Sequence, residues 1–222
     1  MKTEATKSKT ILNNLTDLKP RKAPQQKRAE QTVSHLLEVA ATLLDEVGLD
    51  NFNTNLLAER ANLRVASVYR YYPNKLAILS ALLENWLYQI MDETAELVTA
   101  LKNPEEDWRD IIERFIDTYL AIVVKSKGHL AIRRSVLAAP ELIQIEARLI
   151  RRLSVGIIEA LLARGVKQPL VNLHDTVELF LTTTAQGIDL AYIKSRKNRN
   201  ALATITAEVK LQQKCYLANI LD

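Results

Sequence analysis

The segment FNTNLLAERANLRVASVYRYYPNK, residues 52–75, decides how this chain of 222 residues folds. Its apolar residues form two short helical patterns, over about 55–61 and 65–71, separated by a turn of about four residues. Thr54 stands where a side-chain oxygen can cap the first helix, and Asn62 stands where the chain must turn. Two short helices joined by so short a turn predict a helix-turn-helix.

The second of these helices carries the kinds of side chain that read DNA. A helix in the major groove reaches base edges with short polar and aromatic side chains near its N-terminal end, while flanking donors hold phosphates. The residues that supply such groups here are Arg64, Ser67, Tyr69, Arg70, Tyr71 and Lys75. Outside such a motif the arginines would equally be solvated charges and the tyrosines core residues. For Tyr72, which continues the face of Val68, we predict burial in the core.

The run from Lys27 to Trp86 resembles the TetR family of bacterial transcriptional repressors, most specifically through TNLLAERANLRVASVYRYYPNK at residues 54–75. The resemblance implies a DNA-binding domain whose second and third helices form the helix-turn-helix. It also implies a homodimer that binds a palindromic operator in double-stranded DNA, and a variable C-terminal domain that takes a small-molecule inducer. The expected function is a sequence-specific transcriptional repressor that its inducer releases.

The same resemblance assigns site residues position by position. Thr54 matches the family's phosphate-contacting residue at the start of its second helix, and Asn55 stands where Arg is often found. The recognition-helix face is occupied by Val65, Ala66, Ser67 and Tyr69. Tyr71 matches the aromatic or His residue that contacts the operator, and Lys75 matches the Lys that binds a phosphate at a helix start. Asn62 replaces the usual Gly, which a left-handed turn should tolerate.

Beyond this segment the sequence predicts helices only. The chain has 5 Gly and 6 Pro, about half the average usage of these residues, which disfavours a β-sandwich or barrel. Apolar residues recur at helical three-four spacing from Lys27 onward, and we count nine helices and no convincing strand. The expected fold is all-α, with a DNA-binding domain at 27–75 and a helical ligand-binding and dimerisation domain at 76–222.

Residues 1–26 are predicted to form a basic, disordered arm. Residues 1–28 hold eight Lys or Arg against Glu4 and Asp17, so this stretch is +6 while the whole chain is only +4. Such an arm either contacts DNA or is merely solvated, and charge alone favours neither. The stretch lacks the apolar core of a signal peptide, and the longest uncharged segment, Leu179–Ile188, is too short for a membrane span. We therefore expect a cytoplasmic protein with no membrane contact.

The sequence contains no recognisable catalytic, cofactor or metal motif. Its glycines lie too far apart to cradle a phosphate, and HExxH and GxSxG are absent. Cys215 and the three His residues lack the spacing of zinc ligands. We therefore expect no enzyme, no cofactor and no metal ion, and we expect Cys215 to be buried as a small apolar residue.

The C-terminal region offers candidates for an inducer cavity: Tyr88, Trp108, Phe115, Tyr119, Phe180 and Thr184. Each of them could equally be an ordinary core residue, but together they make a pocket plausible. The last two helices resemble the family's dimer-forming pair, in which small residues such as Gly187 allow close approach. These helices could also close the core of a monomer. If the core leaves no cavity, the alternative is a DNA-binding regulator whose C-terminal domain binds a protein.

Overall fold

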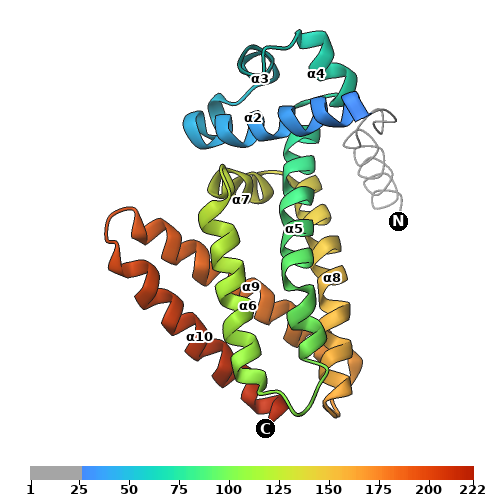
Figure 1. Cartoon of the computed structure of the whole chain (residues 1–222), viewed down its shortest axis with the longest axis vertical. Helices are drawn as coiled ribbons and strands as arrows, with labels where there is room; N and C mark the ends of the chain where they lie inside the picture. Colours follow the sequence, from blue (N-terminus) through green and yellow to red (C-terminus); the bar gives the residue numbers. More distant parts are fainter. Residues whose placement is uncertain (1–26) are drawn as a thin grey trace, which may run out of the picture. The chain divides into compact units, whose positions relative to one another are not determined.

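A computed structural model describes residues 27–222 as a succession of helices (Figure 1). Their bounds are α2 Lys27–Asn51, α3 Thr54–Arg60, α4 Val65–Tyr71, α5 Lys75–Ala100, α6 Trp108–Lys125, α7 His129–Ala138, α8 Pro140–Ala163, α9 Leu170–Ser195 and α10 Asn200–Leu221. Over this range there are nine helices and no strand, so the all-α prediction is confirmed. The predicted basic arm, residues 1–26, lies outside the described residues. Within residues 27–222 no helix is long and apolar enough to cross a membrane.

The described chain divides into two compact units that share the long helices α5 and α8. Unit 1 contains the residues up to Trp86 together with Lys127–Ala147, and unit 2 contains Leu87–Ser126 and Arg148–Asp222. This division differs from the linear boundary predicted at residue 75. The beginning of α5 stays with the N-terminal helices, and α7 with the first part of α8 belongs to the same unit.

In unit 1, Gly128 brings α7 against α2. Its φ is 67°, and a Cβ atom at this position would lie only 2.6 Å from the carbonyl oxygen of Ala41. Glycine alone meets both conditions. His129, the first residue of α7, is 2% exposed, and its ring centroid lies 4.8 Å from that of Trp86 on α5. This contact makes His129 a core residue of unit 1.

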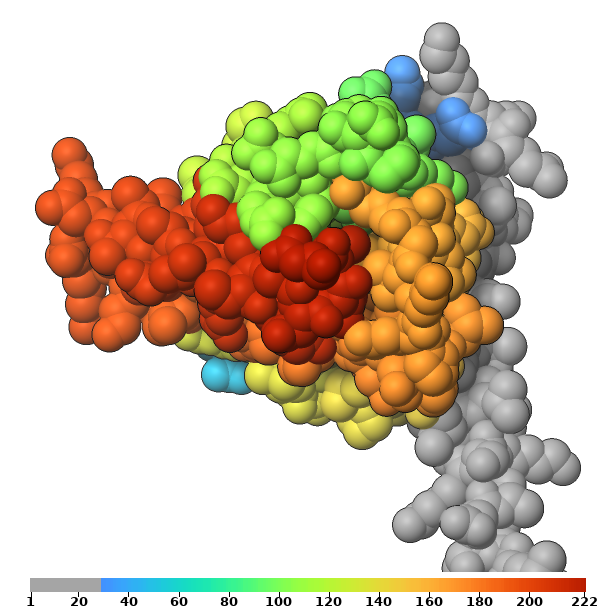
Figure 2. Space-filling model, turned by 90° about the horizontal axis from the view of Figure 1, so that it is seen from below, coloured from blue at the N-terminus to red at the C-terminus, as the bar shows by residue number. Residues whose placement is uncertain are grey.

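In unit 2, α9 and α10 form a hairpin that packs on α6. At Gly187 a Cβ atom would lie 2.5 Å from Val209 Cγ2, so the small residue brings α9 and α10 of one chain together. Two ion pairs join α10 to α6, from Lys210 to Asp117 at 2.7 Å and from Lys214 to Glu113. In the space-filling view of Figure 2 the tip of the hairpin, in orange to red, projects to one side, away from the dark red C-terminal end of α10.

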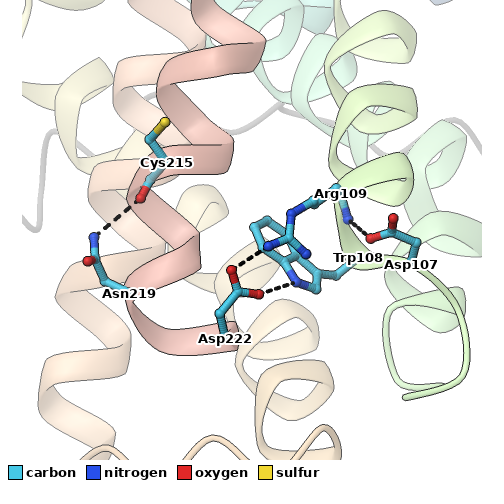
Figure 3. Close-up of polar contacts among 6 residues, drawn as sticks. All are labelled: Asp107, Trp108, Arg109, Cys215, Asn219 and Asp222. Carbon is cyan, nitrogen blue, oxygen red and sulfur yellow. Dashed lines mark hydrogen bonds and ion pairs between the residues drawn. The ribbon is translucent and has the colours of Figure 1, made fainter.

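Asp222 lies against the beginning of α6, as the close-up of Figure 3 shows. Trp108 Nε1 donates a hydrogen bond to Asp222 Oδ1 at 3.3 Å, and Arg109 forms an ion pair with the other carboxylate oxygen. The Arg109 guanidinium also lies 4.4 Å from the centroid of the Trp108 ring. These contacts fasten the end of α10 to the start of α6.

Cys215 is exposed, so the prediction that it is buried is wrong. The buried side chains of α10 nearest to it are Gln213 and Leu217. Each is two residues away, which places Cys215 about half a turn from the buried face. Its own carbonyl oxygen accepts a hydrogen bond from Asn219 Nδ2 at 3.3 Å (Figure 3).

Candidate DNA-binding surface and C-terminal core

The helix-turn-helix begins at Asn53. Gly48, with φ of 74°, ends the regular part of α2. The Asn53 Oδ1 atom then accepts a hydrogen bond from Leu56 N at 2.9 Å, which makes Asn53 the N-cap of α3. The prediction that Thr54 caps this helix is therefore wrong, because Thr54 is the first helical residue.

The Thr54 side chain joins α3 to α4. Its Oγ1 atom lies 3.1 Å from the hydroxyl oxygen of Tyr69, within hydrogen-bond distance. Thr54 is only 9% exposed, whereas Tyr69 is 41% exposed. The hydroxyl predicted to contact a phosphate is thus engaged by Tyr69, and the surface presents the tyrosine.

The turn between the two helices has the left-handed residue that the sequence predicts. Asn62 has φ of 53°. Its N–H donates to Glu59 O at 3.0 Å, while Leu63 N donates to Ala58 O at 2.9 Å. This pair of bonds is a Schellman motif, which satisfies the last carbonyls of α3. The substitution of Asn for Gly is therefore accommodated.

The outer side of α4 presents both cationic and apolar side chains. We name as the reading face six residues, of which all but the partly exposed Ser67 are exposed: Arg64, Val65, Ala66, Ser67, Tyr69 and Arg70. Val68, on the opposite side of the helix, is fully buried, and Asn55 on α3 is exposed. Six of the ten residues predicted to bind DNA therefore lie together on α4 and its N-cap residue, Arg64.

Two tyrosines at the end of α4 are buried. Tyr72 is 1% exposed, which confirms its predicted place in the core, and burial together with the nearby charge of Glu84 raises its pKa to about 12. Tyr71 is 4% exposed. Its hydroxyl accepts a hydrogen bond from Arg70 at 2.8 Å, and the guanidinium lies 4.9 Å from the ring centroid. The Tyr71 ring is thus part of the core, and any contact with DNA falls to its hydroxyl.

Lys75 lies at the start of α5 and reaches back to the end of α2. Its Nζ atom donates to Leu49 O at 2.5 Å and lies 5.8 Å from the centroid of the Phe52 ring. Asn74 Oδ1 accepts a hydrogen bond from Ala77 N at 2.8 Å and so caps α5. A phosphate contact by Lys75 would exchange the Leu49 carbonyl for a phosphate oxygen.

Five of the six predicted inducer-binding residues are buried in unit 2, and four of these lie on successive turns of α6 and α9. The ring centroids of Phe115 and Phe180 are 5.8 Å apart. Tyr119 and Thr184, one turn further along α6 and α9, are 5% and 2% exposed.

The fifth buried residue, Trp108, and the exposed Tyr88 make contacts of other kinds. Trp108 is held by Asp222 at the start of α6. Tyr88 is 39% exposed, and its hydroxyl lies 3.5 Å from a guanidinium nitrogen of Arg152. The structure therefore does not place Tyr88 in the core with the other aromatic residues.

A small recess adjoins the pair of phenylalanines. It is lined by hydrocarbon side chains: Leu97, Val98, Leu101, Ile111, Ile112, Phe115, Ile157 and Phe180. Its volume of about 10 Å³ is room for a single water molecule. Across residues 27–222 no three His, Cys, Asp or Glu side chains gather as metal ligands would.

Two features of the site were not predicted from the sequence. The first is the cap at Asn53, which the sequence does signal, since Asn ranks above Thr at this position. The second is a set of outward-facing apolar residues on the hairpin of unit 2: Leu179, Leu190, Ile193 and Leu211. We call this set the hairpin face. Three of its members are on α9. Leu190 and Ile193 follow the helical spacing that also marks a buried face, so their spacing alone does not show that they are exposed.

Comparison with known proteins agrees with the geometry of the first four helices. The sequence model of bacterial regulatory proteins of the tetR family matches residues 36–82. The tetracycline repressor protein class A from transposon 1721 of Escherichia coli is 34% identical over 77 residues, which cover 35% of this chain and 33% of that protein. The class G tetracycline repressor protein of Vibrio anguillarum is 37% identical over 67 residues, or 30% of this chain and 29% of that protein. The chain thus matches about a third of the length of these curated relatives.

Solved structures match the fold over most of the chain. A TetR-family transcriptional regulator from Streptomyces coelicolor has a TM-score of 0.66 at 25% identity, covering 86% of this chain and 99% of that one. A second, from Mesorhizobium loti, has a TM-score of 0.68 at 15% identity, covering 87% and 98%. Together with the match at the helix-turn-helix, this shared all-α fold shows that the chain belongs to the TetR family of bacterial regulatory proteins.

Proposed function

We propose that the protein is a transcriptional repressor that binds double-stranded DNA as a homodimer and leaves it when a small-molecule inducer binds. The observation that carries the proposal is the exposed reading face of α4, within the segment that the tetR family model matches. Val65 and Ala66 are apolar and short, as a contact with a thymine methyl group requires, and Tyr69 adds a hydroxyl. Arg64 and Arg70 supply charge for the phosphates on either side.

The hairpin face supports the dimer. Leu179, Leu190 and Ile193 of α9 are 49%, 46% and 44% exposed, and Leu211 of α10 is 55% exposed. Exposed apolar side chains on two adjacent helices are typical of a surface that a second chain covers. Two copies paired in this way would carry two reading faces, and a dimer with half-sites one helical turn apart, about 34 Å, binds a palindrome.

Charge substitutions test the dimer. We expect the wild-type protein to sediment as a dimer and the variant with Leu190→Glu and Leu211→Glu to sediment as a monomer. Leu137→Glu is the matched control, since Leu137 is 79% exposed but lies on α7 in unit 1. A double variant that remains dimeric would place the dimer contact elsewhere.

The C-terminal domain leaves two candidates for what it binds. A small inducer is supported by the interior set of aromatic and hydroxyl side chains in unit 2. A protein partner is favoured by the small volume of the recess, about 10 Å³. Titration of the purified dimer with small apolar ligands separates the two.

The experiment that tests DNA binding is selection of bound sequences from a random pool of DNA duplexes, at about 0.15 M salt because affinity depends on salt. We expect enrichment of one inverted repeat. A variant with Tyr69→Ala and Arg70→Ala should enrich nothing, while Leu137→Glu should enrich the same repeat as the wild type. Failure of the wild-type protein to enrich any sequence would contradict the proposal.

A further inference from the structure

Two hydroxyl groups in the interior of unit 2 lack a hydrogen-bond partner among the described residues. They are Thr184 Oγ1 on α9 and Thr206 Oγ1 on α10, in residues that are 2% and 5% exposed. Other buried hydroxyls of the same unit bond back to a carbonyl one turn earlier: Thr94 donates to Ile90 O at 2.7 Å and Ser154 to Ile150 O at 2.9 Å. An unpaired buried hydroxyl destabilises a folded protein, so its presence calls for a reason.

The structure offers a reason for the unpaired hydroxyl of Thr184 but none for that of Thr206. Thr184 lies one helical turn beyond Phe180 on the same side of α9, and Phe180 lines the recess. Phe115, which faces Phe180 across 5.8 Å, lines the recess from α6. The recess has no lining residue on α10, the helix of Thr206. Thr184 does not itself line the recess, but it is the unpaired hydroxyl that stands one helical turn from a lining residue, Phe180.

We infer that this part of unit 2 binds a neutral amphiphile, with an extended hydrocarbon body in the recess and one hydroxyl or carbonyl group on Thr184. The inference rests on the proposed function, since it names the class of inducer that would release the DNA. Hydrocarbon side chains such as Leu101 and Ile157 suit an alkyl or terpenoid body. The Thr184 hydroxyl can either donate to a carbonyl or accept from an alcohol.

The charge of the ligand follows from the lining. A carboxylate or ammonium group in the recess would lose its hydration, and the eight lining side chains offer no opposite charge in return. A neutral polar group loses much less and is paired by Thr184. The site should therefore select an alcohol, ketone or ester over the acid of the same chain length.

The small size of the recess couples the binding of the ligand to the release of DNA. At about 10 Å³ it is closed to any organic ligand, so a ligand can enter only if the helices around it separate. A ligand shifts an equilibrium by as much as it prefers one conformation, and this ligand binds only the opened one. Because α5 and α8 contribute lining residues and also continue into unit 1, their displacement is the change that would reach the reading face.

The test uses the full-length dimer, with 1-octanol as the neutral probe and sodium octanoate as the charged probe of equal length. Calorimetric titration measures binding, the melting temperature measures stability, and fluorescence anisotropy of a labelled operator duplex measures DNA release. Thr184→Val, Thr184→Ser and Thr206→Val are the variants. Both Val variants remove an unpaired hydroxyl with little change of shape, so without ligand both should melt at or above the wild-type temperature.

We expect 1-octanol to bind, to raise the melting temperature and to weaken operator binding, and octanoate to do none of these. Thr184→Val should bind 1-octanol about tenfold more weakly, a change of about 1.4 kcal/mol, while Thr184→Ser and Thr206→Val keep the wild-type affinity. Equal affinity of Thr184→Val and wild type would overturn the role of Thr184, and tighter binding of octanoate would overturn the neutral class.

If the operator is bound but neither probe binds, the inference fails while the DNA-binding proposal stands. If 1-octanol binds as expected but the wild type binds no DNA, the proposed function fails and the ligand site remains.

Discussion

The hydroxyl groups of Thr54 and Tyr69 lie 3.1 Å apart, across the two helices of the helix-turn-helix. One partner is buried and the other is on the reading face. The hydrogen bond therefore fixes the position of an exposed aromatic side chain from below. Thr54 would then assist DNA binding by orienting Tyr69, whereas a direct phosphate contact would need this bond to break.

A double-mutant cycle distinguishes the two roles. If Thr54 acts by orienting Tyr69, Thr54→Val and Tyr69→Phe should each weaken operator binding by about 1 kcal/mol, and the double variant should lose no more than one of them. Thr54→Ser should retain wild-type affinity. Losses that add would show that each hydroxyl contacts the DNA independently. Thr42→Val, which removes a hydroxyl on the exposed side of α2, is the control.

Because Tyr71 is buried, its substitution affects the stability of the fold as well as any contact with DNA. Tyr71→Ala should destabilise the DNA-binding domain by about 3 to 5 kcal/mol, as is usual for removal of a buried aromatic ring. Its loss of DNA binding would then reflect unfolding. Tyr71→Phe keeps the ring and should lower operator affinity by about 1 kcal/mol at an unchanged melting temperature, if the hydroxyl held by Arg70 contacts the operator. Wild-type affinity of Tyr71→Phe would leave Tyr71 a core residue only.

Local signals predicted the bounds of the helix-turn-helix. The left-handed turn at Asn62 and the end of α4 before Pro73 depend on residues a few positions apart. The cap at Asn53 was missed because two adjacent residues can both cap a helix. The choice between them involves Tyr69, fifteen residues further along, which engages the Thr54 hydroxyl.

Contacts between segments distant in the sequence account for the remaining differences between the predictions and the structure. The sequence does not show that α7 belongs to unit 1, because that depends on how closely Gly128 approaches Ala41 of α2. Helical spacing places Cys215 near buried neighbours but does not say which side of α10 is covered. The position of Gln213, whose side chain donates to Thr183 on α9 at 2.9 Å, sets that side.

Lys75 should contribute to DNA binding through charge alone. Lys75→Met keeps the apolar stem over Phe52 and removes the ammonium group, so we expect weaker binding to all duplexes and a salt slope smaller by about one per protomer. Lys102→Met is the control, since Lys102 pairs with Glu159 on the surface of unit 2. An unchanged slope with a lower melting temperature would mean that Lys75 serves only the end of α2, through Leu49 O.

Tyr72 should make the protein less stable in alkaline solution. Its pKa is raised from 10.0 to about 12 in the folded protein, so above pH 10 the unfolded chain releases a proton that the folded chain retains. The stabilisation is complete below pH 10 and is lost as the pH rises toward 12, by up to about 3 kcal/mol. Urea unfolding between pH 9 and 11 should show this decline, and Tyr72→Phe should reduce it. The exposed Tyr88→Phe variant should decline like the wild type, and an equal decline in Tyr72→Phe would contradict the prediction.

Gly187 should be required for the packing of α9 on α10. An alanine methyl at this position would lie 2.5 Å from Val209 Cγ2, and overpacking of this kind destabilises by about 1 to 3 kcal/mol. This exceeds the gain of up to about 1 kcal/mol from replacing glycine within a helix. Thermal unfolding should therefore show that Gly187→Ala is destabilised, and that adding Val209→Ala costs less than it does in the wild type.

Gly156→Ala is the matched control on α8, where the new methyl would lie 3.2 Å from a single atom of Val98 and a small shift can relieve it. Equal effects of the two substitutions would show that helix propensity, and not the contact with Val209, decides the outcome.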